Sequence, residues 1–163
     1  MLGKLKSLFS GPSELAVTAP VSGTVVPLDQ VHDPTFAQGI LGKGAAIEPA
    51  EGRVIAPADG TVDVMFETGH AVSMTTADGI EVLIHVGIDT VSLNGQHYKA
   101  CCKAGDRVKK GDVLIEFDPE AIRAAGYETV TPVIICNTDR FSAVHAAQSG
   151  EVAAGETLLT LQK

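Results

Sequence analysis

Residues 67–90 read ETGHAVSMTTADGIEVLIHVGIDT, and this stretch has the pattern of a β-hairpin. Two runs rich in β-branched and aliphatic residues flank Asp78-Gly79, a dipeptide typical of a two-residue hairpin turn. With that pair as the turn, Val72 faces His85 across the hairpin. Because side chains alternate between the two faces of a strand, this register places His70 and His85 on one face as diagonal neighbours, with β-carbons roughly 7 Å apart or less.

Two neighbouring imidazoles can bind a metal, assist a hydrolase or carry a phosphoryl group, and the motifs present or absent in the sequence reduce these possibilities. A zinc site needs three or four ligands, and no HxH, HExxH or CxxC pattern supplies them. A triad hydrolase needs a nucleophile elbow, and no GxSxG is present. A histidine nucleophile remains, because neutral imidazole has a free lone pair near pH 7 and a phosphoryl group on it is labile. The second histidine can donate a hydrogen bond to the phosphoryl oxygens, and the Thr68 hydroxyl can orient His70.

The same pattern also fits two ordinary histidines at a sheet surface. The hairpin register alone therefore leaves a phosphoryl carrier and a site without function both open.

The rest of the chain predicts one all-β domain. Its 163 residues include 17 Gly and 8 Pro, which break it into short strands joined by turns. Residues 19–25 (APVSGTV) recur as 56–62 (APADGTV), and residues 105–114 recur as 149–158. Two such pairs are too few for a solenoid and predict a closed sandwich with pseudo-symmetric duplicated hairpins.

Two short helices and an N-terminal tail complete the expected organisation. One helix starts at Pro119 with Asp118 as its N-cap and ends at Gly126, and the other covers roughly residues 139–148. Residues 1–12 form an amphipathic tail and residues 13–163 the folded domain. Apolar residues of the segment 2–9 fall near one helical face beside two lysines, so this tail either contacts an anionic membrane surface or is a frayed end.

Composition excludes several classes of protein. The net charge of −8 argues against nucleic-acid binding, which needs a basic surface. The three cysteines are odd in number and no signal peptide precedes them, so we expect free thiols and a cytoplasmic location. No apolar run reaches the roughly 18 residues of a membrane-spanning helix.

Three other functions are compatible with parts of the sequence. Residues 105–114 have the glycine and valine spacing of a biotinyl- or lipoyl-type carrier, but the modified lysine of an MKM-like triplet is missing. A zinc hydrolase on a related β scaffold would need an HxH pair, further ligands and a secretion signal. A purely regulatory binding module would keep the apolar surface without needing a reactive histidine, and phosphotransfer activity separates it from a carrier.

The chain resembles the glucose-type IIA component of the bacterial phosphoenolpyruvate-dependent sugar phosphotransferase system. The most specific matches are TGHA at residues 68–71 and IHVGIDTV at residues 84–91. Further matches lie at residues 19–25, 36–37, 42–49, 56–62, 111–112 and 131–133. Together they run from about residue 17 to residue 161, nearly the whole domain, and the fold that this family implies is an antiparallel β-sandwich.

The resemblance also implies the reaction and the residues that perform it. His85 would accept a phosphoryl group on Nε2 from the phosphohistidine of the phosphocarrier HPr and pass it to a cysteine of a IIB domain or IICB permease. His70 would contact the phosphoryl group, Thr68 would fix the tautomer of His70, and Asp89 would stand at the rim of the site near Asp33.

Partners would dock on an apolar ring around the histidines. The ring expected from the resemblance consists of Phe36, Ile40, Leu41, Phe66, Val72, Leu83, Ile84 and Val91. No cofactor is required, although some relatives share a zinc ion between the paired histidines and a partner's carboxylate. The sugar, and any regulated transporters or kinases, are not written in a IIA domain, since the sugar binds a membrane domain.

Overall fold

The computed structural model describes residues 14–163, whose regular structure consists mainly of short strands joined by turns. The tail expected at residues 1–12, with its membrane contact through residues 2–9, lies outside the described residues. The strands are β1 (Glu14–Thr18), β2 (Gly23–Pro27), β3 (Lys43–Pro49), β4 (Arg53–Ile55), β5 (Gly60–Met65), β6 (Ala71–Thr76), β7 (Glu81–His85), β8 (Tyr98–Ala100), β9 (Arg107–Val108), β10 (Val113–Phe117), β11 (Thr131–Ile135), β12 (Ala143–Ala146), β13 (Glu151–Val152) and β14 (Thr157–Gln162). Short helical turns lie between them: η2 (Leu28–Gln30), α2 (Pro34–Ala37), η3 (Thr90–Leu93), α3 (Pro119–Ala124) and η4 (Thr138–Arg140).

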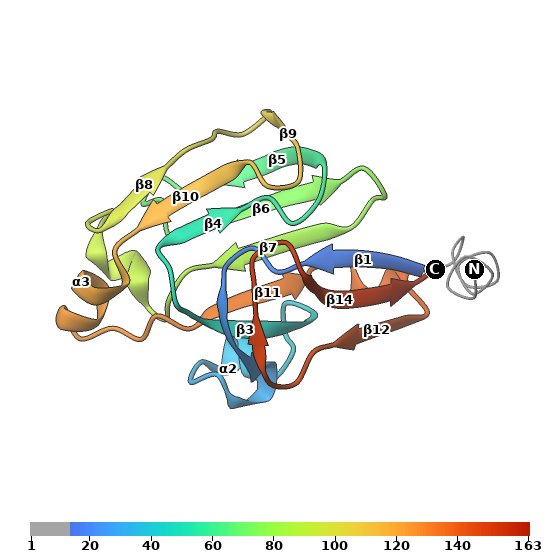
Figure 1. Cartoon of the computed structure of the whole chain (residues 1–163), viewed down its shortest axis with the longest axis horizontal. Helices are drawn as coiled ribbons and strands as arrows, with labels where there is room; N and C mark the ends of the chain where they lie inside the picture. Colours follow the sequence, from blue (N-terminus) through green and yellow to red (C-terminus); the bar gives the residue numbers. More distant parts are fainter. Residues whose placement is uncertain (1–13) are drawn as a thin grey trace.

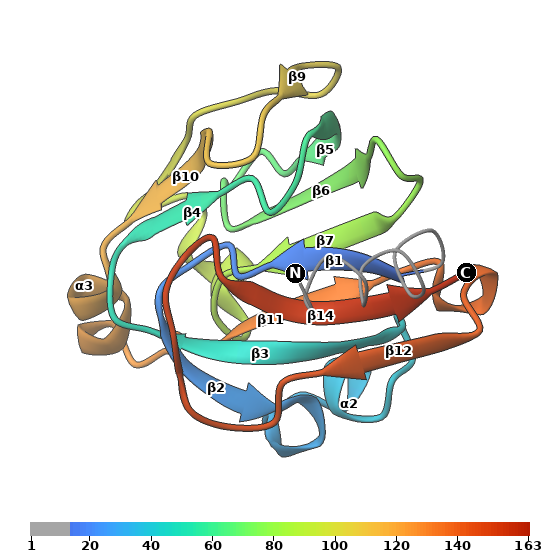
Figure 2. The ribbon, with the colours of Figure 1, turned by 45° about the vertical axis from the view of Figure 1, so that its right-hand side comes forward.

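The strands form three sheets in which the paired strands are antiparallel. The large sheet has the order β13-β2-β3-β11-β7-β6-β5-β9, and the two small sheets have the orders β1-β14-β12 and β4-β10-β8. Figures 1 and 2 show both small sheets over one face of the large sheet. The main hydrophobic core contains buried side chains from all three sheets, among them Val17, Val72, Leu114 and Val133. The expected antiparallel β-sandwich is confirmed.

The two sequence repeats occupy equivalent positions in the fold. Gly23 of β2 pairs with Val152 of β13, and Gly60 of β5 pairs with Val108 of β9 in the same register. The equivalence extends to side chains: the Ser22 hydroxyl accepts a hydrogen bond from the amide of Ala154, and the Asp59 carboxylate accepts one from the amide of Lys110. The duplicated hairpins expected from the sequence are therefore built around the same hydrogen bonds.

The outer face of the large sheet carries a second, smaller hydrophobic cluster. Its buried members are Val31, Phe36, Ala46, Ile88, Val130 and Ile134, and Leu83 packs against them. The helix α2 covers part of this face, since Asp33 caps its N-terminus, Pro34 occupies its first turn and Phe36 is buried beneath it. Because His85 and Leu83 are two residues apart on β7, the outer face is also the face of His85.

The structure corrects the register of the central hairpin by one residue. Ala71, not Val72, pairs with His85, because the turn has three residues rather than two. The amide of Thr76 donates to the carbonyl of Ile80, and Gly79 takes a positive φ of 85° between them. Such three-residue turns also place glycine in the left-handed conformation, so the Asp-Gly signal fits both loop lengths.

The helix expected at residues 139–148 is also wrong. Only Thr138–Arg140 form a helical turn, and Ala143–Ala146 form β12, which pairs with β14. Edge pairing with β14 overrides the helix propensity of this alanine-rich segment. The first helix is confirmed: α3 begins after Asp118, whose carboxylate accepts a hydrogen bond from the amide of Ala121.

Residues 14–163 contain no helix of the length and hydropathy needed to cross a bilayer. Cys101, Cys102 and Cys136 are free thiols.

Candidate functional site

His85 ends β7 on the outer face of the large sheet, where its ring is half-buried. The ring packs against Phe36, with ring centroids 5.0 Å apart. Its Nδ1 lies 2.8 Å from the carbonyl oxygen of Gly87. A carbonyl only accepts, so Nδ1 carries the proton and Nε2 keeps its lone pair. The backbone therefore selects the tautomer in which Nε2 is free to act as a nucleophile.

His70 lies against His85 despite the change in register. The two ring centroids are 4.8 Å apart and the rings are nearly perpendicular, at 83°. His70 precedes β6 in the bend that joins it to β5, so it does not follow the alternation of the strand. The amide of Val86 donates to the carbonyl of His70 and holds the bend beside the end of β7. The pairing of the two histidines expected from the sequence is confirmed, whereas the register that predicted it is not.

The Thr68 hydroxyl is hydrogen-bonded to Nδ1 of His70. If the hydroxyl donates, Nε2 of His70 carries the ring proton and can donate to a group bound on His85. Phe66 supports His70 from another side, with ring centroids 5.3 Å apart in an edge-to-face arrangement.

The surroundings keep both imidazoles neutral near pH 7. Burial, and then the neighbouring His85, lower the pKa of His70 from 6.5 to about 4. Burial also lowers the pKa of His85, while the Gly87 hydrogen bond and the carboxylates of Asp33 and Asp89 act in the opposite direction. Both acidic residues expected at the rim thus act on the charge of His85.

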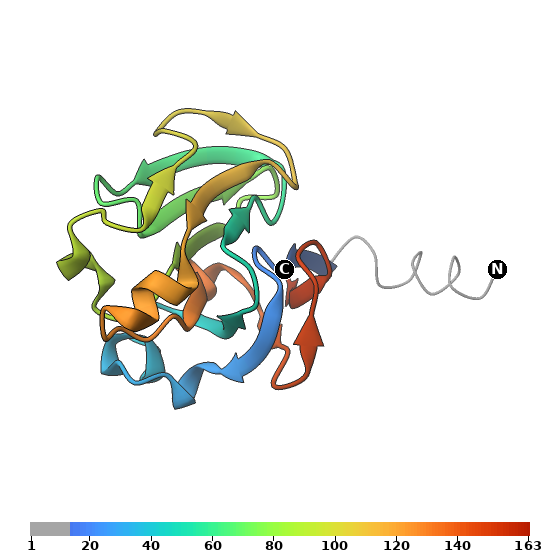
Figure 3. The ribbon, with the colours of Figure 1, turned by 60° about the vertical axis from the view of Figure 1, so that its left-hand side comes forward.

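The apolar ring around the histidines is partly as expected. Ile40, Leu41, Phe66 and Val91 are between 38% and 67% exposed, and Leu83 is partly exposed. Ile40 and Leu41 follow α2 and Val91 belongs to η3, and Figure 3 shows these two helical segments on the same side of the molecule. Phe36 is buried and contributes through its contact with the His85 ring.

Two members of the expected ring are wrong. Val72 and Ile84 are completely buried, because they pair with each other on the inner face of the sheet and belong to the main core. Val64, which the sequence reasoning missed, is 47% exposed. A bulge between Val62 and Val64 reverses the alternation of β5, so that Val64 pairs with Ser73 on the outer face. Simple alternation would have placed Val64 inside, and nothing in the sequence signals the bulge.

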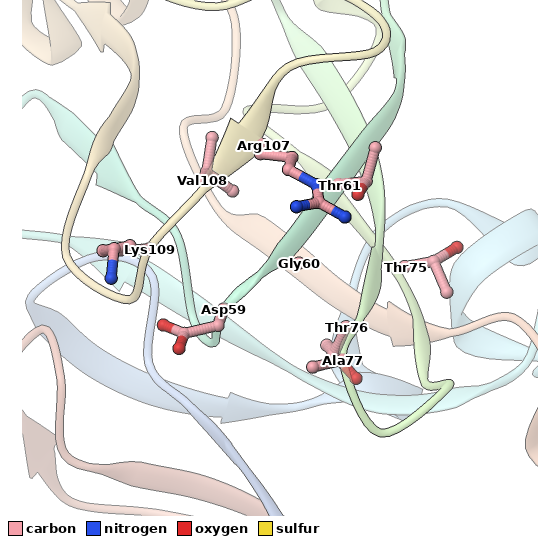
Figure 4. Close-up of a pocket in the computed structure, with 9 residues that line it drawn as sticks. All are labelled: Asp59, Gly60, Thr61, Thr75, Thr76, Ala77, Arg107, Val108 and Lys109. Carbon is pink, nitrogen blue, oxygen red and sulfur yellow. The ribbon is translucent and has the colours of Figure 1, made fainter.

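A cavity of about 480 Å³ lies away from the histidines, at the opposite end of the β5–β6 hairpin, where Gly60 begins β5 and Thr76 ends β6. Figure 4 shows the Arg107 side chain reaching over Thr61, with Asp59 at the rim. The site around His85 is instead an open surface, which suits contact with a macromolecule better than enclosure of a small one.

The comparison with protein families decides the assignment. Residues 15–141 match the model of the phosphoenolpyruvate-dependent sugar phosphotransferase system EIIA 1 family. The chain belongs to this family. Membership of the EIIA 1 family confirms the resemblance carried by residues 68–71 and 84–91, and it makes the chain a component of a phosphotransferase system.

Relatives of the EIIA 1 family occur both as separate proteins and within longer ones. The chain is 45% identical over 145 residues to a glucose-specific EIIA component of Oceanobacillus iheyensis, covering 89% of this chain and 88% of that protein. It is 47% identical over 155 residues to a β-glucoside-specific EIIBCA component of Bacillus subtilis, covering 95% of this chain. The chain spans only about a quarter of the length of the β-glucoside-specific EIIBCA relatives from Bacillus subtilis and Dickeya chrysanthemi.

A solved structure supports the fold of this EIIA 1 member. The glucose permease IIA from Mycoplasma capricolum superposes with a TM-score of 0.82 at 32% identity, covering 90% of this chain and 95% of that chain.

Proposed function

We propose that this chain is a phosphoryl carrier in which Nε2 of His85 is the acceptor. The observation that carries the proposal is the hydrogen bond from Nδ1 of His85 to the carbonyl of Gly87, because it leaves the lone pair of Nε2 free. The incoming phosphoryl group would come from the phosphohistidine of HPr, and its acceptor would be a cysteine of a IIB domain. The protein would act in the cytoplasm, where both partners are reached.

The transfer needs no proton to leave His85. The N–P bond of the donor breaks and its electron pair returns to the donor nitrogen as a new bond forms between phosphorus and Nε2, while the proton stays on Nδ1 of His85 and remains hydrogen-bonded to the Gly87 carbonyl. In the second transfer the cysteine attacks as its thiolate. A bond forms between its sulfur and phosphorus, and the electron pair of the broken N–P bond returns to Nε2. The Nε2–H of His70 donates to the phosphoryl oxygens in both steps.

The neutral state of His70 bears on its role. With a pKa of about 4, His70 is uncharged before phosphorylation and acts as a neutral hydrogen-bond donor. It therefore neither repels nor strongly attracts the phosphoryl group of phospho-HPr. The acidic residues Asp33 and Asp89 would face basic side chains of partners across the apolar ring. These partners would be HPr and the IIB domain, with regulated transporters or kinases as further candidates.

A zinc ion shared with a partner is a separate part of the proposal. The chain offers two imidazoles, and residues 14–163 hold no group of three or more His, Cys, Asp or Glu that could bind a metal. A partner would have to supply at least one further ligand. The carrier reaction itself should therefore proceed in the presence of a chelator.

Incubation with phosphoenolpyruvate, enzyme I and HPr tests the function. We expect an acid-labile, base-stable phosphoprotein, with and without EDTA, and no label in His85→Ala. Absence of label in the wild-type chain, or label that survives His85→Ala, would contradict the assignment of His85.

A further inference from the structure

Tyr98 lies behind the two histidines, and no role for it follows from the carrier chemistry. Its ring is 6.5 Å from that of His70 in an edge-to-face arrangement and stacks on Phe117, with centroids 6.4 Å apart. Its hydroxyl donates to the carbonyl oxygen of Val86 at 2.8 Å. The same side chain thus contacts His70 and the backbone that follows His85.

The carbonyl that Tyr98 binds belongs to a peptide unit held at both ends. The Thr90 hydroxyl donates to the same Val86 oxygen at 2.7 Å, and the Gly87 amide of this peptide donates to the carbonyl of Val130 at 3.1 Å. The next peptide is held as well, because the amide of Ile88 donates to the carbonyl of Glu128. The orientation of Gly87, and with it the direction of its carbonyl, is set by these contacts.

The Gly87 carbonyl is the group that accepts the hydrogen bond from Nδ1–H of His85. The Gly87 carbonyl belongs to the following peptide, so a rotation of the Val86–Gly87 peptide would displace it only by changing the backbone conformation at Gly87. Once this carbonyl is displaced from Nδ1, the ring is free to carry its proton on Nε2 instead. That tautomer has no lone pair on the proposed acceptor atom. The hydroxyl of Tyr98 therefore acts on the reactive nitrogen through the two peptide units that meet at Gly87.

The loop that delivers Tyr98 is strained. Asp89, Asn94 and His97 have φ values of 60°, 52° and 76°, and they are the non-glycine residues with positive φ among residues 14–163. Left-handed backbone at such residues costs free energy and persists where the surrounding structure imposes it. All three lie within residues 89–97, the nine residues immediately before Tyr98, so the strain is concentrated where this side chain is placed.

We propose that Tyr98 is a positioning residue for phosphoryl transfer: its hydroxyl holds the Val86–Gly87 peptide so that Gly87 keeps the proton of His85 on Nδ1 and leaves Nε2 unprotonated. This inference rests on the proposed function of His85. Tyr98 would raise the fraction of molecules whose His85 ring is in the reactive tautomer, and it would not contribute to the binding of a partner.

The variant Tyr98→Phe tests the inference, because it removes the hydroxyl and keeps the ring against His70 and Phe117. The chain has one other tyrosine, Tyr127, which also packs partly buried against the core. Tyr127→Phe is the matched control, since the Tyr127 hydroxyl forms no hydrogen bond with any of residues 14–163. Thermal unfolding of both variants shows whether the fold is kept.

Two measurements follow on the full chain. The first is ¹⁵N NMR of the His85 ring in the unphosphorylated protein, which reports the tautomer and does not depend on activity. We expect Tyr98→Phe to shift the ring toward protonation on Nε2, with Tyr127→Phe unchanged. The second is the rate of phosphoryl transfer from phospho-HPr, where we expect kcat to fall about tenfold at an unchanged KM, on the scale of one lost hydrogen bond.

A Tyr98→Phe variant with the wild-type tautomer of His85 would overturn the inference. So would a variant in which KM for phospho-HPr rises while kcat is unchanged, because Tyr98 would then act on docking. Failure of the wild-type chain to accept phosphate would contradict the proposed function, and the NMR measurement would still decide the role of Tyr98.

Discussion

His70 and His85 touch each other but differ in how far they are buried. His70 is 3% exposed, whereas His85 is half-buried at the outer face. The more buried ring has the pKa of about 4, because removal from water penalises its charged form. Burial thus lowers the pKa of both rings, while His85, the proposed acceptor, keeps part of its ring accessible.

The low pKa of His70 predicts a specific pH dependence of stability. Its pKa in the unfolded chain is near 6.5, so between pH 6.5 and 4 the unfolded state binds more protons than the folded state. The free energy of unfolding should fall as the pH is lowered through this window, with about 3 kcal/mol coming from His70. Urea unfolding at a series of pH values measures the effect.

The variant His70→Gln is the control for this prediction, since glutamine cannot take up the proton. The remaining titratable groups are shared by both proteins, so the difference between the two pH curves isolates His70. Equal losses of stability in both proteins between pH 6.5 and 4 would contradict the low pKa.

The turn after β7 depends on Gly87 for two separate reasons. Its φ of 89° lies in the left-handed region, and a β-carbon there would stand 2.4 Å from Cγ2 of Thr90 and 2.9 Å from the carbonyl oxygen of Glu128. Both the conformation and the space require glycine. The backbone conformation of this turn points the Gly87 carbonyl at Nδ1 of His85.

Gly87→Ala should therefore lower the free energy of unfolding by about 3 kcal/mol or more, and the variant should lose phosphorylation from HPr. Gly79→Ala in the β6–β7 turn is the matched control: its φ is also positive, at 85°, but nothing lies within 4 Å of the added carbon. It should lose about 1–2 kcal/mol and keep phosphorylation. Similar stabilities of the two variants, measured by urea unfolding, would show that crowding at Gly87 is unimportant.

The short elements could be predicted where local signals decide them. The N-cap of α3 at Asp118 and the repeats at residues 19–25 and 56–62 rest on such signals, and both are confirmed. β12 forms because it pairs with β14, and the bulge of β5 arises in its pairing with β6. Neither pairing can be read from the sequence of the element itself. The hairpin register failed for a related reason, since the Asp-Gly pair permits turns of two lengths.

The large sheet separates a structural face from a face available to partners. Val72 and Ile84 point into the main core, whereas Val91 and Phe66 are exposed on the side of the histidines. An exposed apolar group beside a reactive site is typical of a docking surface. Apolar side chains therefore form the core on one face of the sheet and an exposed surface available to partners on the other.

Two valine variants test this division. Val91→Ser should change the free energy of unfolding by less than about 0.5 kcal/mol and weaken HPr binding roughly tenfold, because it removes an exposed contact. Val72→Ala should lose about 2 kcal/mol of stability through the cavity it creates and leave HPr binding unchanged. Isothermal titration calorimetry and urea unfolding measure the two effects, and weaker HPr binding by a folded Val72→Ala would contradict the inner placement of Val72.

The amino-acid sequence by itself determined the fold class, the duplicated hairpins and the two histidines of the site, because strand patterns, turn residues and the motifs at residues 68–71 and 84–91 are local. The tertiary structure alone decided which side chains share a face with His85, which group binds its Nδ1 and where Tyr98 reaches. The reason is physical: register, burial and hydrogen bonds to the backbone depend on segments distant in the chain, such as Glu128 and Val130 beside Gly87. A shift of one residue in the pairing of a strand moves each of its side chains to the opposite face of the sheet, and the turn sequence of this hairpin permits both registers.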